Sequence, residues 1–172
     1  ATRRSGSREG GAALIVIRLV SAVAAVGWVS ALGAAADPGE NIARGKPYRL
    51  APAPNYQHCT DAQDVKQLTD GVLVEGYFWT QRGTVGWSGV CPVTVTIDLG
   101  AVEPIDGVSF RTAAGVAGVR WPEAIYLFVS DDRSAYRVVG DLVALSAAKE
   151  MPPADGYAVH IFRCSGLAAR GR

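Results

Sequence analysis

Imidazole groups able to act as a general base are scarce in this 172-residue chain, which has only two histidines. A hydrolytic site needs a nucleophile beside a base, and neither His58 nor His160 stands in a recognisable catalytic motif. His160 lies in the alternating run 157–163, where we expect a strand residue on the less apolar face. The segment 86–89 (GWSG) resembles a nucleophile elbow, but that motif has glycines two positions before and after its serine.

The carboxylates give no further sign of catalysis. Glu75, Glu103 and Glu123 are isolated in loop-like sequence, whereas glycoside hydrolysis needs two carboxylates at a fixed separation. The chain also contains neither a zinc-binding H-E-x-x-H pattern nor a phosphate-binding loop. The sequence therefore predicts a protein that is not an enzyme in its own right and has no catalytic residues.

Aromatic residues gather between positions 77 and 87, together with Gln81 and Arg82. Flat rings stack on the apolar faces of sugars, and neighbouring Arg and Gln side chains donate directional hydrogen bonds. We therefore expect a ligand site on loops. Its predicted residues are Trp87, Arg82 and Trp121, with Tyr56 and His58 as weaker candidates.

Each tryptophan also has an alternative role in the core. We expect Trp79 to fill the end of the core rather than to bind ligand. Trp87, flanked by Gly86 and Ser88, is open to either role, because small neighbours would leave its ring uncovered. Trp121 precedes Pro122 and could equally be a binding residue or a core plug.

Charge and cysteine content exclude some partners. From position 37 onward there are 13 Lys and Arg against 15 Asp and Glu, so this part has no basic surplus for nucleic acid. The cysteines Cys59, Cys91 and Cys164 are too few for a disulfide framework. A Cys59–Cys91 disulfide and three unpaired thiols both stay open.

The first 36 residues have the composition of an export signal. Three arginines within the first eight residues precede an apolar run, 11–36, whose single charge is Arg18. Alanines at 34–36 match the small-residue pattern of a cleavage site, so we predict a signal peptide over 1–36 and cleavage after Ala36. The alternative is a retained membrane anchor over 14–36. Either interpretation places the protein outside the cell or at its envelope.

Short extended segments separated by turn residues dominate the rest of the chain. Residues 93–99 alternate strictly between apolar and polar, which is typical of a strand with one buried face. Further strands are expected at 105–110, 125–130, 136–139 and 157–163, with a tight turn at 131–134 and a short helical stretch at 142–148. This pattern favours an all-β fold, a sandwich or a barrel.

Four short motifs then occur in a fixed order: NIARGKP at 41–47, LTDG at 68–71, TIDLG at 96–100 and VSDD at 129–132. Together they resemble the discoidin, or coagulation factor 5/8 type C, domain, which is similar to family 32 carbohydrate-binding modules. The resemblance implies a galactose-binding-like jelly-roll β-sandwich over 37–172, with ligands on loops at one end.

The resemblance also implies features that this chain matches only in part. The family continues after a Gly-Arg pair such as 171–172 with a closing strand, so we expect the sandwich to lack its last strand. Many members hold a structural calcium near the Asp-Gly motif. Asp70 matches the first ligand of that calcium, but the acidic residue from the final strand has no counterpart here.

The function expected from these observations is a non-catalytic extracellular module that targets an attached enzyme or surface to a glycan. One alternative is the N-terminal part of a secreted glycoside hydrolase whose catalytic domain follows Arg172. Another is a discoidin module that binds protein or phospholipid, which the near-neutral charge does not favour. Contact with a membrane is expected only through the N-terminal segment, if that segment is not cleaved.

Overall fold

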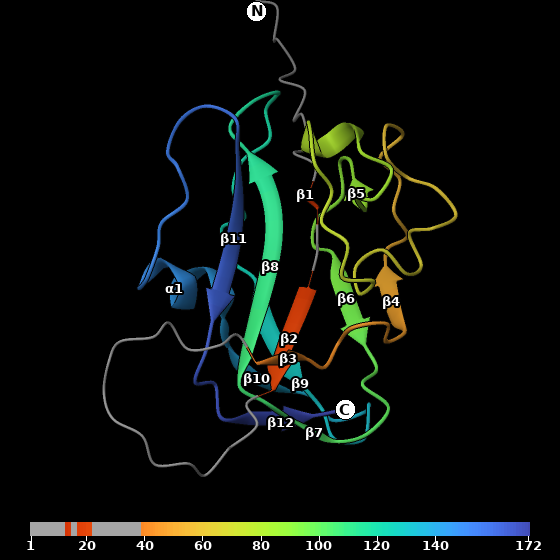
Figure 1. Cartoon of the computed structure of the whole chain (residues 1–172), viewed down its shortest axis with the longest axis vertical. Helices are drawn as coiled ribbons and strands as arrows, with labels where there is room; N and C mark the ends of the chain where they lie inside the picture. Colours follow the sequence, from red (N-terminus) through yellow and green to blue (C-terminus); the bar gives the residue numbers. More distant parts are fainter. Residues whose placement is uncertain (1–12, 15–16, 22–38) are drawn as a thin grey trace, which may run out of the picture.

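A computed structural model describes residues 13–14, 17–21 and 39–172, and most of its regular structure is β-strand. The only helical elements among these residues are the α-helix α1 (Leu142–Ala147) and the 3-10 helix η1 (Phe78–Thr80). The expected all-β fold is therefore confirmed (Figure 1). The strands are β1 (Ala13–Leu14), β2 (Ile17–Ser21), β3 (Glu40–Asn41), β4 (Tyr48–Ala51), β5 (Gly86–Trp87), β6 (Thr94–Ile97), β7 (Glu103–Ile105), β8 (Gly107–Ala114), β9 (Tyr126–Val129), β10 (Arg137–Asp141), β11 (Ala158–Cys164) and β12 (Ala169–Gly171).

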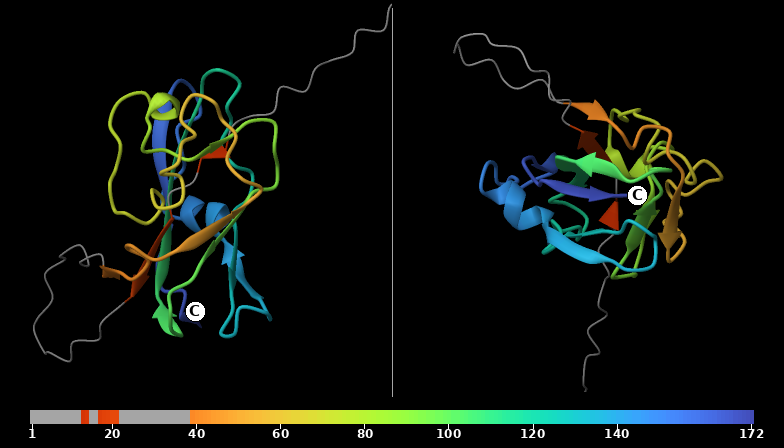
Figure 2. Two further views of the ribbon diagram at one scale, coloured as in Figure 1. Left: turned by 90° about the vertical axis from the view of Figure 1, so that its right-hand side faces the viewer. Right: turned by 90° about the horizontal axis from the view of Figure 1, so that it is seen from below.

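The largest sheet has four antiparallel strands in the order β11-β8-β2-β3. β8 and β11 pair over seven residues, from Val108 opposite Cys164 to Ala114 opposite Ala158. Four two-stranded ladders, β4–β6, β9–β10, β7–β12 and β1–β5, complete the described strands. The β9–β10 hairpin lies on the opposite side of the molecule from β2 and β3 (Figure 2).

The strands expected from the sequence are found, with one difference. The strand expected at 105–110 is divided into β7 and β8 at Asp106, whose carbonyl accepts a hydrogen bond from Leu167 N–H (2.7 Å). β8 begins at Gly107, where any Cβ would clash with the Cys164 carbonyl oxygen on the paired strand. Glycine is needed here because the two backbones approach closely.

The expected tight turn between β9 and β10 is also confirmed. The Asp132 carboxylate accepts hydrogen bonds from the backbone N–H groups of Ala135 (2.9 Å) and Ser134 (2.8 Å) and from the Ser130 hydroxyl (2.9 Å). These bonds, of which the one from Ala135 N–H has the largest effect, hold the pKa of Asp132 well below its usual range. The turn is thus closed by a side chain that stays ionised.

The short helix begins where the sequence indicated, directly after β10. Asp141 is its N-cap, and its carboxylate accepts a hydrogen bond from Val143 N–H (3.0 Å). The same oxygen accepts from Ile125 N–H (2.9 Å), which ties the helix start to the residue before β9. α1 buries Leu142 and Ser146.

Most of the predicted signal segment, 1–36, lies outside the described residues. Its described parts are β1 and β2, and β2 takes a place inside the largest sheet, between β8 and β3. Ile17 lies opposite Phe110 and Val20 opposite Gly107. Within the described ranges, no helix combines the length and apolarity needed to cross a membrane.

Candidate functional site

Three of the five predicted ligand residues come together on two neighbouring loops. The Arg82 guanidinium donates to the Thr60 carbonyl (3.2 Å), and the rings of Tyr56 and His58 meet edge to face with centroids 5.2 Å apart. Tyr56 is half-buried, whereas His58 and Arg82 are exposed. An aromatic ring, an imidazole and a guanidinium therefore share one surface region.

Backbone and amide hydrogen bonds hold the Tyr56 loop in place. The Asn55 side chain donates to the Ser88 carbonyl (3.1 Å) and accepts from Ser88 N–H (2.8 Å). Tyr56 N–H donates to the Gly86 carbonyl (3.1 Å). These three hydrogen bonds join the loop that carries Tyr56 and His58 to residues 86–88. The loop therefore has a defined position before any ligand arrives.

Trp87 lies elsewhere: its side chain is 0 % exposed and packs in a core cluster with Leu68 and Val85. Its indole N–H donates to the Pro52 carbonyl (2.8 Å). The expectation that small neighbours leave this ring uncovered is wrong, because Leu68, Val85 and side chains of β4 and β6 pack around it and the 52–56 segment accepts its indole N–H. In this arrangement Trp87 offers no stacking face to a sugar.

Trp121 is half-buried and belongs to a different region. Its indole N–H donates to the Pro153 carbonyl (2.8 Å), and its ring meets Phe162 and His160 edge to face. With Met151 and Phe162 it lines a mainly apolar hollow of about 400 Å³ beside α1. The structure thus places Trp121 against the main core and does not bring it together with Tyr56, His58 and Arg82.

One aromatic pair near the two loops could not be found from sequence spacing. Tyr77 and Tyr157, 80 positions apart, are both exposed and stack with ring centroids 4.8 Å apart and an interplanar angle of 30°. The Tyr157 hydroxyl accepts a hydrogen bond from Phe78 N–H (2.9 Å). The sequence pattern assigns Tyr157 only to a strand and Tyr77 only to a loop rich in aromatic residues, so no local signal joins them.

A buried cluster of Cys59, Phe78, Trp79 and Ala113 connects these rings, with Tyr56 packed against it from one side. Tyr77 and Tyr157 both contact Trp79 edge to face, with centroids 5.2 and 5.6 Å away. The expected core role of Trp79 is therefore confirmed. We call Tyr56, His58, Tyr77, Arg82 and Tyr157 the loop-end aromatic site.

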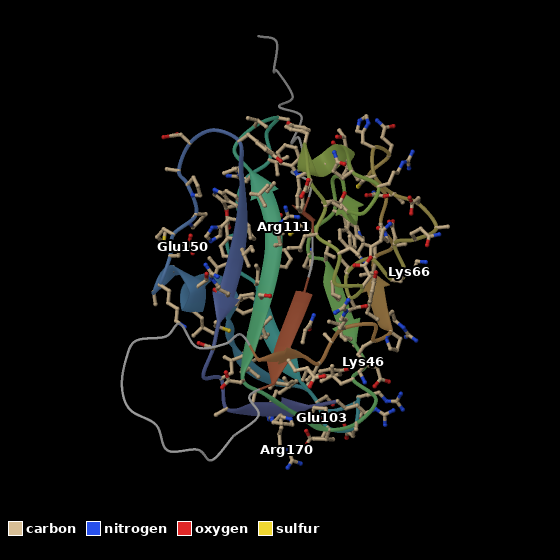
Figure 3. The ribbon with its side chains drawn as sticks, in the orientation of Figure 1. Lys46, Lys66, Glu103, Arg111, Glu150 and Arg170 are labelled. Atoms are coloured by element: carbon tan, nitrogen blue, oxygen red, sulfur yellow. The ribbon has the colours of Figure 1, made fainter. Side chains whose placement is uncertain are left out.

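Arg111 on β8 fixes the loop that carries Tyr77. Its guanidinium donates to the Val74 carbonyl (3.0 Å) and lies over the Phe78 ring, 5.1 Å from the centroid. Figure 3 shows Arg111 in the middle of β8, whereas Lys46 and Lys66 lie in loops and Arg170 lies on β12. The labelled basic side chains form no single basic face.

The calcium ion expected at Asp70 stays a prediction, and two contacts of this motif bear on it. One carboxylate oxygen of Asp70 already accepts Val72 N–H (2.7 Å). The Arg44 side chain lies so close to Gly71 that its Nε would be 3.2 Å from an added Cβ, which places a positive charge beside the motif. No group of three or more His, Cys, Asp or Glu suited to a metal occurs in the described part of the chain. A calcium ion, which takes about six to eight oxygen ligands, would have to compete with both of these contacts.

All three cysteines are free, so the Cys59–Cys91 disulfide is not formed. Cys59 is buried among Phe78 and Trp79, whereas Cys91 is exposed. Burial raises the pKa of the Cys59 thiol, with a smaller lowering effect from its hydrogen bond with Thr84. Cys59 therefore acts as a small core residue and not as a nucleophile.

Asp64 is a buried carboxyl group close to the site. The residue is 4 % exposed, and neither carboxylate oxygen has a hydrogen-bond partner among the described residues. Desolvation raises the pKa of Asp64, while the neighbouring Asp61 backbone and, less strongly, the Arg82 charge lower it. Two other unpartnered oxygens, on Thr60 and Gln67, belong to the same segment.

Replacing Asp64 with asparagine is expected to stabilise the protein by about 1–3 kcal/mol at pH 7, because an unsatisfied buried charge is removed. In the unfolded chain Asp64 ionises near pH 3.9, whereas the folded state holds the proton to higher pH. The penalty therefore develops as pH rises above that value and is absent below it. Urea unfolding at pH 7 and pH 3.5 measures the difference, which should vanish at the lower pH.

Asp61 provides the matched control. Its carboxylate accepts Gln63 N–H (2.7 Å) and the Gln67 amide (3.4 Å), so Asp61→Asn should leave stability unchanged or lower it. A destabilised Asp64→Asn variant at pH 7 would show that the carboxylate has a partner and that this interpretation of Asp64 is wrong.

His160 is buried, contrary to the expectation that it lies on the less apolar face of its strand. It is enclosed by the rings of Trp121 and Phe162, and its Nε2 has no partner among the described residues. Ile161 and Arg163, which alternate with Phe162 along this strand, are exposed. Desolvation lowers the pKa of His160, so its neutral form is favoured.

Acidification should therefore reduce stability through His160. The unfolded chain takes up this proton near pH 6.5, and the folded protein does so only at lower pH, so stability is lost as pH falls below about 6.5. The melting midpoint of the parent should drop between pH 7.5 and 5.5, and by less in His160→Leu. His58→Leu, at the exposed histidine, should show the full drop of the parent.

Comparison with known proteins adds no relative: no family model, no curated protein and no solved structure matches this chain. The geometry of the described residues is therefore the basis for assigning a function.

Proposed function

We propose that this chain is a non-catalytic carbohydrate-binding module of the discoidin, or factor 5/8 type C, kind, with a jelly-roll sandwich that carries its ligand on loops at one end. The observation that carries the proposal is the loop-end aromatic site. Tyr56, His58 and Arg82 lie on two linked loops, and the exposed Tyr77–Tyr157 pair packs on Trp79, a member of the buried cluster that Tyr56 also contacts.

The chemistry of this site suits a neutral sugar. Tyrosine rings supply flat apolar faces on which a sugar can stack. Hydrogen bonds to the sugar hydroxyls can come from the Tyr56 and Tyr77 hydroxyls, the His58 imidazole and the Arg82 guanidinium. The supporting loops are held by backbone bonds and by Arg111, so little ordering is required on binding. The module would act outside the cell, where it holds an attached enzyme or surface to a glycan.

A shallow site of this kind should bind with a Kd of roughly 0.1–1 mM. A glycan array with the parent protein identifies the sugar, and calorimetric titration of that sugar gives the affinity. A protein that binds no sugar on the array up to millimolar concentrations would overturn the proposal.

A further inference from the structure

The run of turns over residues 62–69 buries polar side chains and exposes an apolar one. Asp64 is 4 % exposed and Gln67 7 %, whereas Val65 between them is 71 % exposed. A turn that packs against a protein core ordinarily buries its apolar residues, and reversals of such local rules are expected at functional sites. The buried face of these turns therefore has a role other than core packing.

Backbone hydrogen bonds place three polar side chains on this buried face. Asp64 N–H donates to the Asp61 carbonyl (3.3 Å), and Lys66 N–H donates to the Gln63 carbonyl (2.9 Å). Bonds between residues three apart align the side chains at every third position, so Asp61, Asp64 and Gln67 share one face. A side-chain contact agrees with this alignment, because the Gln67 amide N–H donates to the Asp61 carboxylate (3.4 Å). We call this face the inner face of the turns.

The oxygen atoms of the inner face outnumber the donors that they meet. Both carboxylate oxygens of Asp64, Oε1 of Gln67 and Oγ1 of the adjacent Thr60 have no hydrogen-bond partner among the described residues. Turning the Gln67 amide over would not help, because its Nε2 donates to the Arg82 carbonyl (2.6 Å) and an oxygen there would be repelled. The two hydrogen bonds that the Asp61 carboxylate accepts in the described chain both end on Oδ1, which leaves Oδ2 for another partner.

Charge and atom type select a cation for this place. The carboxylates of Asp61 and Asp64 outnumber the one guanidinium beside them, that of Arg82, which is bonded to the Thr60 carbonyl (3.2 Å). An anion or a neutral acceptor would add oxygen atoms to a face that already lacks donors. Carboxylate, amide and hydroxyl oxygens are the ligands of hard cations, and together with water they can supply the about six to eight that calcium takes.

We propose that a calcium ion binds on the inner face of the turns, with the Asp64 carboxylate as its central ligand. Asp61, Gln67 and Thr60 supply further oxygens. The bound ion gives the buried carboxylate a charge partner and so stabilises the folded chain. This site is separate from the calcium ion expected at Asp70, which follows the last of these turns.

Melting of the whole chain at neutral pH, in EDTA and in calcium chloride, tests the proposal. Calcium sites of extracellular modules have a Kd of about 0.1–1 mM, so about 10 mM calcium should raise the melting midpoint by about 3–10 °C. Sodium chloride of equal ionic strength is the control for screening of surface charges, and it should not reproduce this rise.

Asp64→Asn should respond in the opposite way in the two buffers. In EDTA the variant should melt above the parent, because the unpaired buried charge is gone. In calcium it should keep less than about a third of the parent's rise, because its central ligand is lost. Asp70→Asn is the matched control: it makes the same change next to the turns, and asparagine keeps an oxygen for Val72 N–H (2.7 Å). It should show the full rise of the parent.

A parent whose melting midpoint is not raised by calcium would overturn the proposal and would mean that water meets these oxygens. A full calcium response in Asp64→Asn would overturn it too. A response that is lost in Asp70→Asn would place the ion at that residue instead and would contradict the site on the inner face. Because melting is measured without sugar, none of these results bears on the sugar site.

Discussion

Trp87→Ala is expected to lower the free energy of unfolding by about 3–5 kcal/mol, as for other large aromatic residues removed from a core. The ring is wholly buried with Leu68 and Val85, and its indole N–H bonds to the Pro52 carbonyl. Truncation leaves a cavity among these side chains and an unpaired carbonyl oxygen. Chemical denaturation of the parent and the variant measures the loss.

Arg82→Ala is the control for this prediction. Arg82 is exposed and its guanidinium bonds to the Thr60 carbonyl at the surface, so its removal should change stability by less than about 1 kcal/mol. A Trp87→Ala protein as stable as Arg82→Ala would mean that the ring is not part of the core, and the sugar-stacking role first expected for Trp87 would return.

Removal of residues 1–36 is expected to lower the free energy of unfolding by about 2–4 kcal/mol, because β8 loses the hydrogen bonds of a paired strand over four residues. The exposed edge of β8 should also promote self-association of the shortened protein. Melting and denaturation of the whole chain and of a chain beginning at Asp37 give the difference.

A point variant in β2 distinguishes the loss of strand pairing from other effects of removing residues 1–36. Leu19→Pro eliminates one backbone donor inside β2, whereas Leu19→Val keeps the donor and suits a strand. Leu19→Pro should reproduce most of the loss and Leu19→Val little of it. Equal stability of all four proteins would contradict a structural role for β2.

This result also bears on the predicted cleavage after Ala36. Cleavage at that position removes β1 and β2 together, so a secreted product that begins at Asp37 must leave the β8 edge open or pair it with another strand. N-terminal sequencing of exported protein decides whether cleavage occurs. The same preparation of exported protein can be used to test whether residues 1–36 are cleaved and whether their absence lowers stability.

Strand positions could be predicted because alternation is a local signal. Residues 94–97 follow directly from period-2 patterning, and the turn closed by Asp132 follows from turn chemistry. The burial of His160 could not be predicted in this way. In β11 both faces carry apolar residues, so the pattern does not say which face turns inward, and Phe162 and Trp121 decide it through long-range packing.

The candidate site was predictable only in part, for a similar reason. Tyr56, His58 and Arg82 were found from residue type, because polar and aromatic side chains in loop-like sequence tend to lie at the surface. The burial of Trp87 does not follow from the small side chains of Gly86 and Ser88, because Leu68, Val85 and side chains of β4 and β6 pack around its ring. Tyr157 was missed because its partner Tyr77 lies 80 positions away.

Sugar binding at the loop-end aromatic site is tested most directly by one titration series. The sugar chosen from the array is titrated into the parent, Tyr77→Ala and Tyr126→Ala, which each remove one exposed tyrosine ring. Tyr77→Ala should weaken binding at least about tenfold, which corresponds to about 1.4 kcal/mol. Tyr126→Ala, on β9, should bind the sugar as the parent does. Unchanged affinity in a folded Tyr77→Ala, or a loss in Tyr126→Ala instead, would contradict sugar binding at this site.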